Sequence, residues 1–202
     1  MSSSRGTGRQ YWVAIRAMIV LTIVVGVIYP LVITGVGQLA FAAQANGSLV
    51  KVNGTTVGSS LIGQSFTDAK GNAIATWFQS RPSAAGKGYD SGASSGSNYG
   101  PENPTLITSI ADRKKAIESL DGVTASQIPA DALTTSASGL DPQISPAYAL
   151  LQVNAVAKAR GLDPSKVKAL VESKIQGRDL GYLGEPTVNV LQLNIALAEM
   201  SK

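Results

Sequence analysis

The side chains that most often carry out catalysis are missing from this sequence, which has no histidine and no cysteine among its 202 residues. Histidine is the commonest general base and metal ligand near neutral pH, and serine or cysteine nucleophiles usually depend on it. A zinc site would have to consist of carboxylates alone, and the acidic residues form no dense cluster. We therefore predict no catalytic residues, no metal site and no cofactor bound by the chain itself.

Two short patterns resemble known chemical motifs, but each lacks an essential part. Ser48 and Lys51 have the S-x-x-K spacing of penicillin-binding enzymes, yet no K-T-G sequence accompanies them. The stretch Gly86-Lys87-Gly88 lacks the upstream glycine and the hydroxyl residue of a phosphate-binding P-loop. Neither pattern predicts an enzyme, although a membrane-anchored hydrolase stays open as an alternative.

Polar residues that adjoin glycine or proline form a different kind of candidate site, because constrained loops often carry recognition. Together with an amide on an otherwise apolar helix, they give six predicted subunit-interface residues: Arg81, Asn98, Asn103, Asp141, Glu185 and Asn189. Turn formation, helix capping and internally bonded amides are the alternative explanation for the same residues.

An uncharged run from Ala17 to Val50 precedes these loops and determines where they lie relative to a membrane. About 20 apolar residues are enough to cross the hydrocarbon core of a bilayer. Arg5, Arg9 and Arg16 precede or open the run, and no acidic residue occurs before Asp68. By the positive-inside rule we predict a cytoplasmic tail (1–11), a transmembrane helix (12–36) and an extracytoplasmic domain (37–202) of a single-pass cell-membrane protein.

Four residues near the outer end interrupt the apolar run and predict that the helix packs against protein: Tyr29, Pro30, Thr34 and Gln38. A proline there frees a backbone carbonyl that a neighbouring helix can help to satisfy. A cleaved secretory signal is one alternative, but its apolar region is typically about 7–15 residues, shorter than this run. A core helix of a soluble protein is the other.

The charge of the remaining domain is almost balanced. Three of the 17 basic residues lie at or before the apolar run, so 14 basic residues face 13 acidic ones. The sequence pI of about 9.4 thus reflects membrane orientation, and we predict no nucleic-acid partner. Without disulfides, the domain must be stabilised by its core and by docking to partners.

Turn and capping signals indicate an α+β domain of short strands and about four helices. Residues 46–79 suggest strands with Asn-Gly turns and a short strand at Trp77-Phe78, and residues 80–100 form a long loop. Cap-Pro starts and glycine stops predict helices over 103–122, 145–161 and 163–177. A fourth helix follows Pro186, and residues 128–135 suggest an edge strand.

Seven blocks in order resemble the C subunit of Kdp-type potassium-transporting ATPases, over almost the whole chain from about Tyr29 to Leu197. The blocks are YPL…T…Q (29–38), GSSLIGQSF (58–66), FQSRPSA (78–84), S…SN…G…N (94–103), IPAD through SGLDPQIS (128–145), ARG (159–161) and GEPTVNVLQLN (184–194).

The resemblance implies an accessory subunit of an ATP-driven, high-affinity potassium importer. Its implied partners are a channel-like potassium-binding subunit, a P-type ATPase subunit and a small single-helix membrane subunit, while ATP and potassium belong to the complex. Family members have been described as catalytic chaperones that raise the nucleotide affinity of the ATPase subunit, with the glutamine at Gln64 as a suggested nucleotide contact. The charge pattern, however, places Gln64 on the side opposite ATP.

We expect the domain to cap the outer entrance of the potassium pathway and to stabilise the assembly. Its near-neutral charge suits docking better than a cation-concentrating funnel, which needs excess carboxylate. A free-standing, membrane-anchored exported binding module is the alternative from another functional class.

Overall fold

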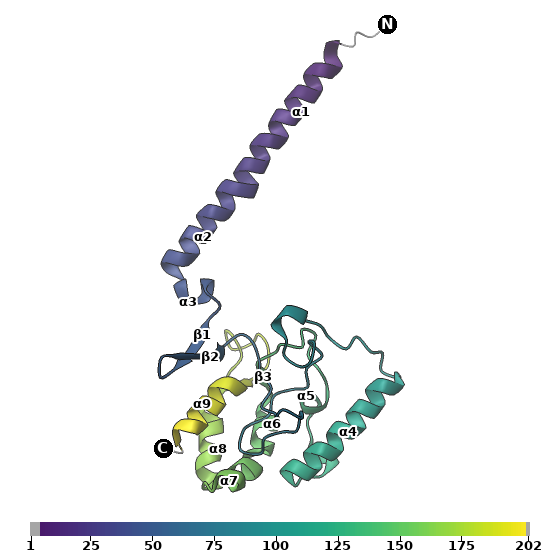
Figure 1. Cartoon of the computed structure of the whole chain (residues 1–202), viewed down its shortest axis with the longest axis vertical. Coiled ribbons are helices and arrows are strands. Elements are labelled where there is room, and N and C mark those ends of the chain that lie inside the picture. Colours follow the sequence, from purple (N-terminus) through teal and green to yellow (C-terminus); the bar gives the residue numbers. More distant parts are fainter. Residues whose placement is uncertain (1–4, 201–202) are drawn as a thin grey trace. The chain divides into compact units, whose positions relative to one another are not determined.

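The computed structural model describes residues 5–200 and divides the chain into two compact units, residues 1–48 and Leu49 onward. Residues 1–4 of the predicted cytoplasmic tail and residues 201–202 of the predicted domain lie outside the described part. The first unit is helical, and the second combines short strands with helices, so the α+β prediction is confirmed (Figure 1).

The first unit is a long helix in which α1 (Arg5–Ile23), a π-helical turn η1 (Val24–Ile28) and α2 (Tyr29–Ala40) follow one another without a break. Within the described chain, Thr7–Ala40 is the one helix long and apolar enough to cross a membrane, with 34 residues. At 1.5 Å per residue its length is about 51 Å.

The π-helical turn has a local cause in Pro30. Proline has no N–H, and its ring collides with the carbonyl four residues earlier in a regular α-helix. Here the turn widens just before the proline, and the N–H of Tyr29 donates to the carbonyl of Val24, five residues back. The bulge therefore accommodates Pro30 without ending the helix. A short helix α3 (Ala42–Ala45) follows.

The second unit begins with a β-hairpin of β1 (Leu49–Val52) and β2 (Thr55–Ser59). Asn53 and Gly54 both have positive φ angles, 49° and 79°, as a type I′ turn requires. The predicted Asn-Gly hairpin turn is thus confirmed.

A three-stranded antiparallel sheet lies further along the chain, with β5 (Thr187–Asn189) between β3 (Gln143–Ile144) and β4 (Ile175–Gln176). Val188 is paired with residues of both neighbours and is fully buried. The sheet is small, but its central strand reaches the hydrophobic core.

The predicted cap-Pro helix starts are confirmed: α4 (Pro104–Asp121), α6 (Pro146–Leu151) and α8 (Pro164–Ser173) begin after Asn103, Ser145 and Asp163, whose side chains accept backbone N–H groups. The second helix is interrupted at Gln152 and continues as α7 (Val153–Arg160). The predicted end of the third helix at Gly177 is wrong, because residues 175–176 pair with β5 instead.

Two predicted strands are also wrong. Residues 128–135 follow the 3-10 turn η3 (Ala125–Gln127) and contain the helix α5 (Ala130–Leu133). The carboxylate of Asp131 in its first turn accepts bonds from the backbone N–H and the hydroxyl of Ser145. Trp77-Phe78 forms no strand, because the Trp77 N–H donates to the carbonyl of Ile74 in a turn and the side chain of Asn194 bonds both backbone groups of Phe78.

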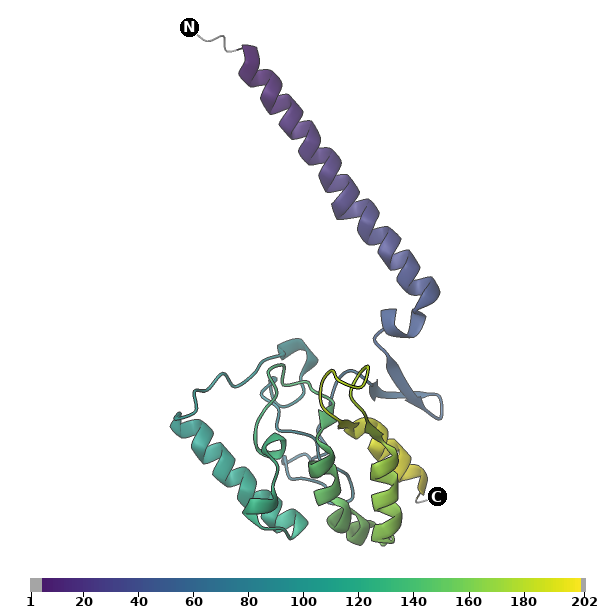
Figure 2. The ribbon, with the colours of Figure 1, turned by 180° about the vertical axis from the view of Figure 1, so that it is seen from behind.

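The core gathers around Phe78 and the helices α6 to α9 (α9, Val190–Met200). Figure 2 shows these four helices together on one side of the domain, with α4 along the other side. Fully buried members include Val167 and Val171 on α8 and Leu193 and Leu197 on α9. The long segment 80–100 contains only the 3-10 turn η2 (Ser91–Ala93), as predicted for a loop.

Candidate functional site

The side chain of Gln64 is used inside the domain. Its Nε2 donates to the carbonyl of Val57 on β2 at 2.7 Å, and its backbone carbonyl accepts from the hydroxyl of Ser80 at 2.8 Å. Gly58 lies directly over this amide, where any Cβ would overlap Gln64 and crowd Leu191. Gln64 therefore fastens the hairpin to the body of the domain.

Gln64 also lines a groove of about 340 Å³ between the hairpin and α9. The groove is mainly apolar, with Asn53, Gln64, Asn194 and Glu199 as its polar members and the following apolar ones: Val52, Val57, Phe66, Trp77, Leu191, Ile195 and Ala198. No basic residue lines it, and residues 198–199 belong to the C-terminal turn of α9, the negative end of the helix dipole. Phosphates prefer basic side chains or helix N-termini, so this groove suits an apolar group better than a nucleotide.

The aromatic side of the groove is pinned by Arg160 on α7. Its Nε donates to the carbonyl of Thr76 at 2.5 Å, and its guanidinium carbon lies 4.2 Å from the ring centroid of Trp77. Trp77 in turn contacts Phe66, with ring centroids 6.2 Å apart. The hydrogen bond from Arg160 to Thr76 and the cation–π contact together hold the Trp77 ring in place.

A second cluster is centred on Arg81 and fastens the start of the long loop. Its Nη1 lies 3.1 Å from the carboxylate of Asp141, and Nη2 donates to the carbonyl of Thr134 at 3.4 Å. Asp141 also accepts the backbone N–H of Gln143, the first residue of β3, at 2.9 Å. Two predicted interface residues, Arg81 and Asp141, are thus brought together as an internal ion pair.

Ser83 and Tyr89 extend this cluster along the loop. The hydroxyl of Ser83 donates to the carbonyl of Gly139 at 2.6 Å and accepts the N–H of Tyr89 at 2.8 Å. The Tyr89 hydroxyl donates to the carbonyl of Arg81 at 2.9 Å. Burial is the main cause that raises the pKa of Tyr89 to about 12, and the nearby Asp141 carboxylate acts in the same direction. Tyr89 therefore stays a hydrogen-bond donor at neutral pH.

The other predicted interface residues have different surroundings. Asn103 caps α4 by accepting the N–H of Thr105. The prediction that Asn189 lies on a helix is wrong, because it is the last residue of β5. Asn189 is 4% exposed, donates to the carbonyl of Ser60 and accepts the N–H of Gln192. Asn98 is exposed with a positive φ of 53°. Glu185 is exposed and lies 2.6 Å from Arg178. Asn98 and Glu185 are accordingly the two most accessible of the six.

The predicted packing residues of the long helix are all exposed in the described chain. Pro30, Thr34 and Gln38 are spaced by four residues and therefore share one face. The amide of Asn46 donates to Oε1 of Gln38 at 2.9 Å, which ties the helix end to the turn after α3. A stripe that combines a proline with two polar side chains is suited to helix–helix contact.

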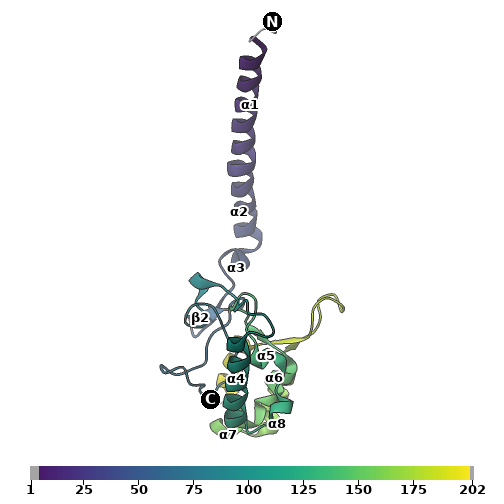
Figure 3. The same ribbon diagram turned by 90° about the vertical axis from the view of Figure 1, so that its right-hand side faces the viewer.

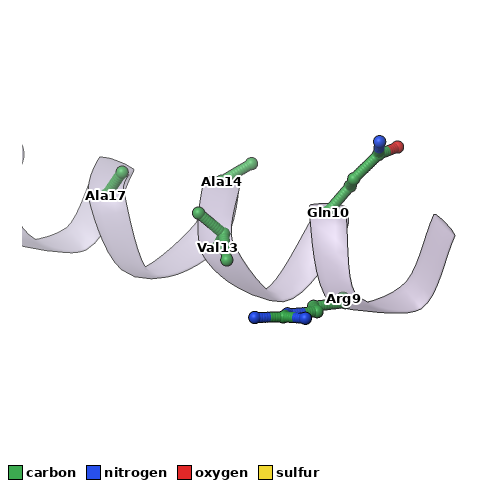
Figure 4. Close-up of a pocket in the computed structure, with 5 residues that line it drawn as sticks. All are labelled: Arg9, Gln10, Val13, Ala14 and Ala17. Carbon is green, nitrogen blue, oxygen red and sulfur yellow. The ribbon is translucent and has the colours of Figure 1, made fainter. Parts of the chain in front are cut away.

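A shallow hollow lies near the start of the same helix, bordered by Arg9, Gln10, Val13, Ala14 and Ala17. Figure 4 shows the Arg9 and Gln10 side chains directed to different sides of the helix, with the short side chains Ala14 and Ala17 beyond them. A hollow over one helix has no opposing wall, so it offers space for a neighbouring helix and no enclosed ligand site.

Sequence reasoning did not assign roles to two features. Gln152 accepts the N–H of Gln79 at 2.6 Å and donates to its carbonyl at 3.3 Å, and it is 1% exposed. An exposed apolar tip at residues 180–183 was also missed. Across residues 5–200, no group of three or more acidic side chains could hold a metal ion.

A family model described as "K+-transporting ATPase, c chain" (KdpC) matches residues 11–199. The protein named Potassium-transporting ATPase KdpC subunit in Mycobacterium tuberculosis (strain H37Rv) is 47% identical over 190 residues, covering 94% of this chain and 97% of the relative. Proteins of the same name are 49% identical in Dechloromonas aromatica (94% and 96% covered) and 52% identical in Gemmatimonas aurantiaca (90% and 88%).

Proposed function

Because the chain belongs to the KdpC family, the c chains of K+-transporting ATPases, we propose that it is the accessory subunit of an ATP-driven potassium importer. The observation that carries this proposal is the family match itself, which runs through both the long helix and the domain. The subunit is non-catalytic in this proposal, and its role is to stabilise the assembly that performs the transport.

We propose that the partners are the channel-like potassium-binding subunit, the P-type ATPase subunit and the small single-helix subunit. ATP and potassium bind to the complex and not to this chain. The stripe of Pro30, Thr34 and Gln38 is suited to packing against another membrane helix.

The proposed orientation places the N-terminus in the cytoplasm and the domain outside. Arg9 and Arg16 lie in the first half of the long helix, and the segment from Ala17 to Val50 has no charge. Positive residues at one end favour retention of that end in the cytoplasm. The cell membrane is the proposed location, with residues 12–36 inside the bilayer and residues 37–202 outside.

In this orientation Gln64 cannot meet cytoplasmic ATP, and the apolar groove beside it gives independent support. We therefore propose that Gln64 acts by holding the hairpin through Val57. Any effect of the subunit on nucleotide affinity would then pass through the assembly, because binding at one place can shift the populations of states elsewhere.

We propose that the domain caps the outer entrance of the potassium pathway. The experiment deletes residues 49–202 while keeping the helix, in cells that express all subunits. Complex yield or potassium affinity should fall, and the full-length chain expressed in the same way serves as the control. Unchanged yield and affinity without the domain would contradict the proposal.

A further inference from the structure

The segment between β4 and β5 forms an ordered tip rather than a loose loop. Asp179 and Leu183 exchange two backbone hydrogen bonds of 2.9 Å each. At its base the side chains of Arg178 and Glu185 approach to 2.6 Å. Figure 3 shows this segment extending away from the helices of the domain. Its backbone is therefore held in shape before any partner arrives.

The tip displays apolar side chains to solvent. Leu180 is 82% exposed, Tyr182 is 68% exposed and Leu183 is 49% exposed. Leu180 also has a positive φ of 53°, a left-handed conformation that is unfavourable for a non-glycine residue. An exposed leucine in an unfavourable conformation contributes nothing evident to the fold, so its side chain suggests a contact outside the domain.

We infer that this tip inserts into an apolar pocket on the extracytoplasmic surface of another subunit of the same membrane assembly. The inference rests on the proposed function. Tyrosine is enriched among the residues that dominate binding energy at interfaces, and a rigid tip loses little conformational entropy on docking.

The small size of the tip favours a partner held in the same complex. Stable interfaces between free proteins bury about 1,200–2,000 Å², far more than three side chains supply. Tethering raises the effective concentration and lets a small contact persist. Only residues 41–48 separate the long helix from β1, and such a segment spans at most about 28 Å. The domain therefore stays close to its membrane partners.

The charge of the tip favours a polypeptide over a lipid surface or a second copy. Arg178 is paired with Glu185, which leaves Asp179 as the remaining charge of residues 178–185. Peripheral lipid contacts usually combine apolar residues with an excess of Lys or Arg. Two copies meeting through this tip would bring their Asp179 carboxylates near each other.

The test uses the full complex, purified through another subunit. The double variant Leu180→Asn, Tyr182→Ser removes the apolar side chains, and asparagine tolerates a positive φ better than leucine. We expect the variant subunit to dissociate from the detergent-solubilised complex at least tenfold faster, with an unchanged or higher unfolding temperature. The control is Ile107→Ser, at a residue on α4 that is 56% exposed, which should dissociate like the wild type.

A photo-reactive amino acid at position 182 identifies the occupant in intact membranes. An adduct with another polypeptide subunit of the assembly supports the inference. An adduct with lipid, an adduct with a second copy of this chain, or equal retention of the double variant overturns it. If the wild-type chain does not co-purify with the ATPase at all, the proposed function itself fails, and the docking inference falls with it.

Discussion

Asn194 on α9 satisfies both backbone groups of Phe78: its Oδ1 accepts the N–H and its Nδ2 donates to the carbonyl, each at 2.9 Å. The two residues are 116 positions apart in the sequence, and both are buried. The amide thus replaces the strand that the Trp77-Phe78 sequence predicts, and it anchors the most buried aromatic ring of the domain.

Replacing Asn194 with alanine should destabilise the domain by about 2–4 kcal/mol, because two buried backbone groups lose their partners. Denaturant unfolding of the full chain in detergent measures the change. Asn154→Ala, at an exposed position of α7, is the matched control and should change stability by less than about 0.5 kcal/mol. Equal effects of the two substitutions would show that the buried amide has no special role.

Arg81→Ala should loosen the loop of residues 80–100 by removing the contacts to Asp141 and Thr134. Limited trypsin digestion reports this directly, because Lys87 in that loop is exposed, and local opening controls cleavage. Cleavage after Lys87 should be several-fold faster in the variant. Arg178→Ala, which removes an exposed ion pair instead, should leave that rate unchanged.

Asp121, the last residue of α4, should make the domain less stable as the pH rises. Burial raises its pKa from 3.8 to about 6. Between about pH 4 and 6 the folded state then binds more protons than the unfolded state, so stability decreases through this range and stays reduced above it. Since the side chain is partly exposed, solvent screening limits the penalty to about 1 kcal/mol.

Asp121→Asn should therefore raise the free energy of unfolding at pH 7 by about 1 kcal/mol and remove the decline between pH 4 and 6. Chemical denaturation at several pH values measures both effects. Asp112→Asn, at an exposed position of the same helix, should keep the wild-type pH profile. If stability still declines between about pH 4 and 6 in the Asp121→Asn variant, another group causes that decline.

The orientation of the chain in the membrane can be determined by labelling single introduced cysteines, since the chain has none of its own. A membrane-impermeant maleimide should label Glu118→Cys from the outside of intact cells, and it should label Thr7→Cys only after permeabilisation. Labelling of Thr7→Cys in intact cells would reverse the proposed topology. A cleaved signal would instead remove position 7 from the mature chain.

Local signals predicted much of this fold, and contacts between distant residues account for the failures. Asn103 and Gly122 set the ends of α4 through their own conformations, so the bounds of that helix are correct. The end of α8 depends on pairing between Ile175 and Val188, which no local pattern encodes. Likewise, the sequence shows Asn194 as an amide in an apolar segment, but it gives no sign of its partner Phe78, which lies 116 positions away.

The same difference between local signals and contacts of distant residues applies to the candidate site. Arg81 and Asp141 stand out beside proline and glycine, yet only the folded chain shows that they bind each other. No sequence periodicity indicates the tip at residues 180–183, because the property that distinguishes it is solvent exposure and not composition. Sequence reasoning therefore found the residues near turns more readily than their partners.

The π-helical turn before Pro30 also changes which residues of the long helix share a line. In an unbroken α-helix, about 18 residues complete five turns, so Thr34 would lie directly in line with Arg16. One additional residue in the widened turn rotates the first half by about 100° relative to the second. Ile15 then takes the place of Arg16 in line with Thr34, and Arg16 is turned to the side of that line by about 100°. A partner helix that follows this stripe through the bilayer would meet an uncharged surface.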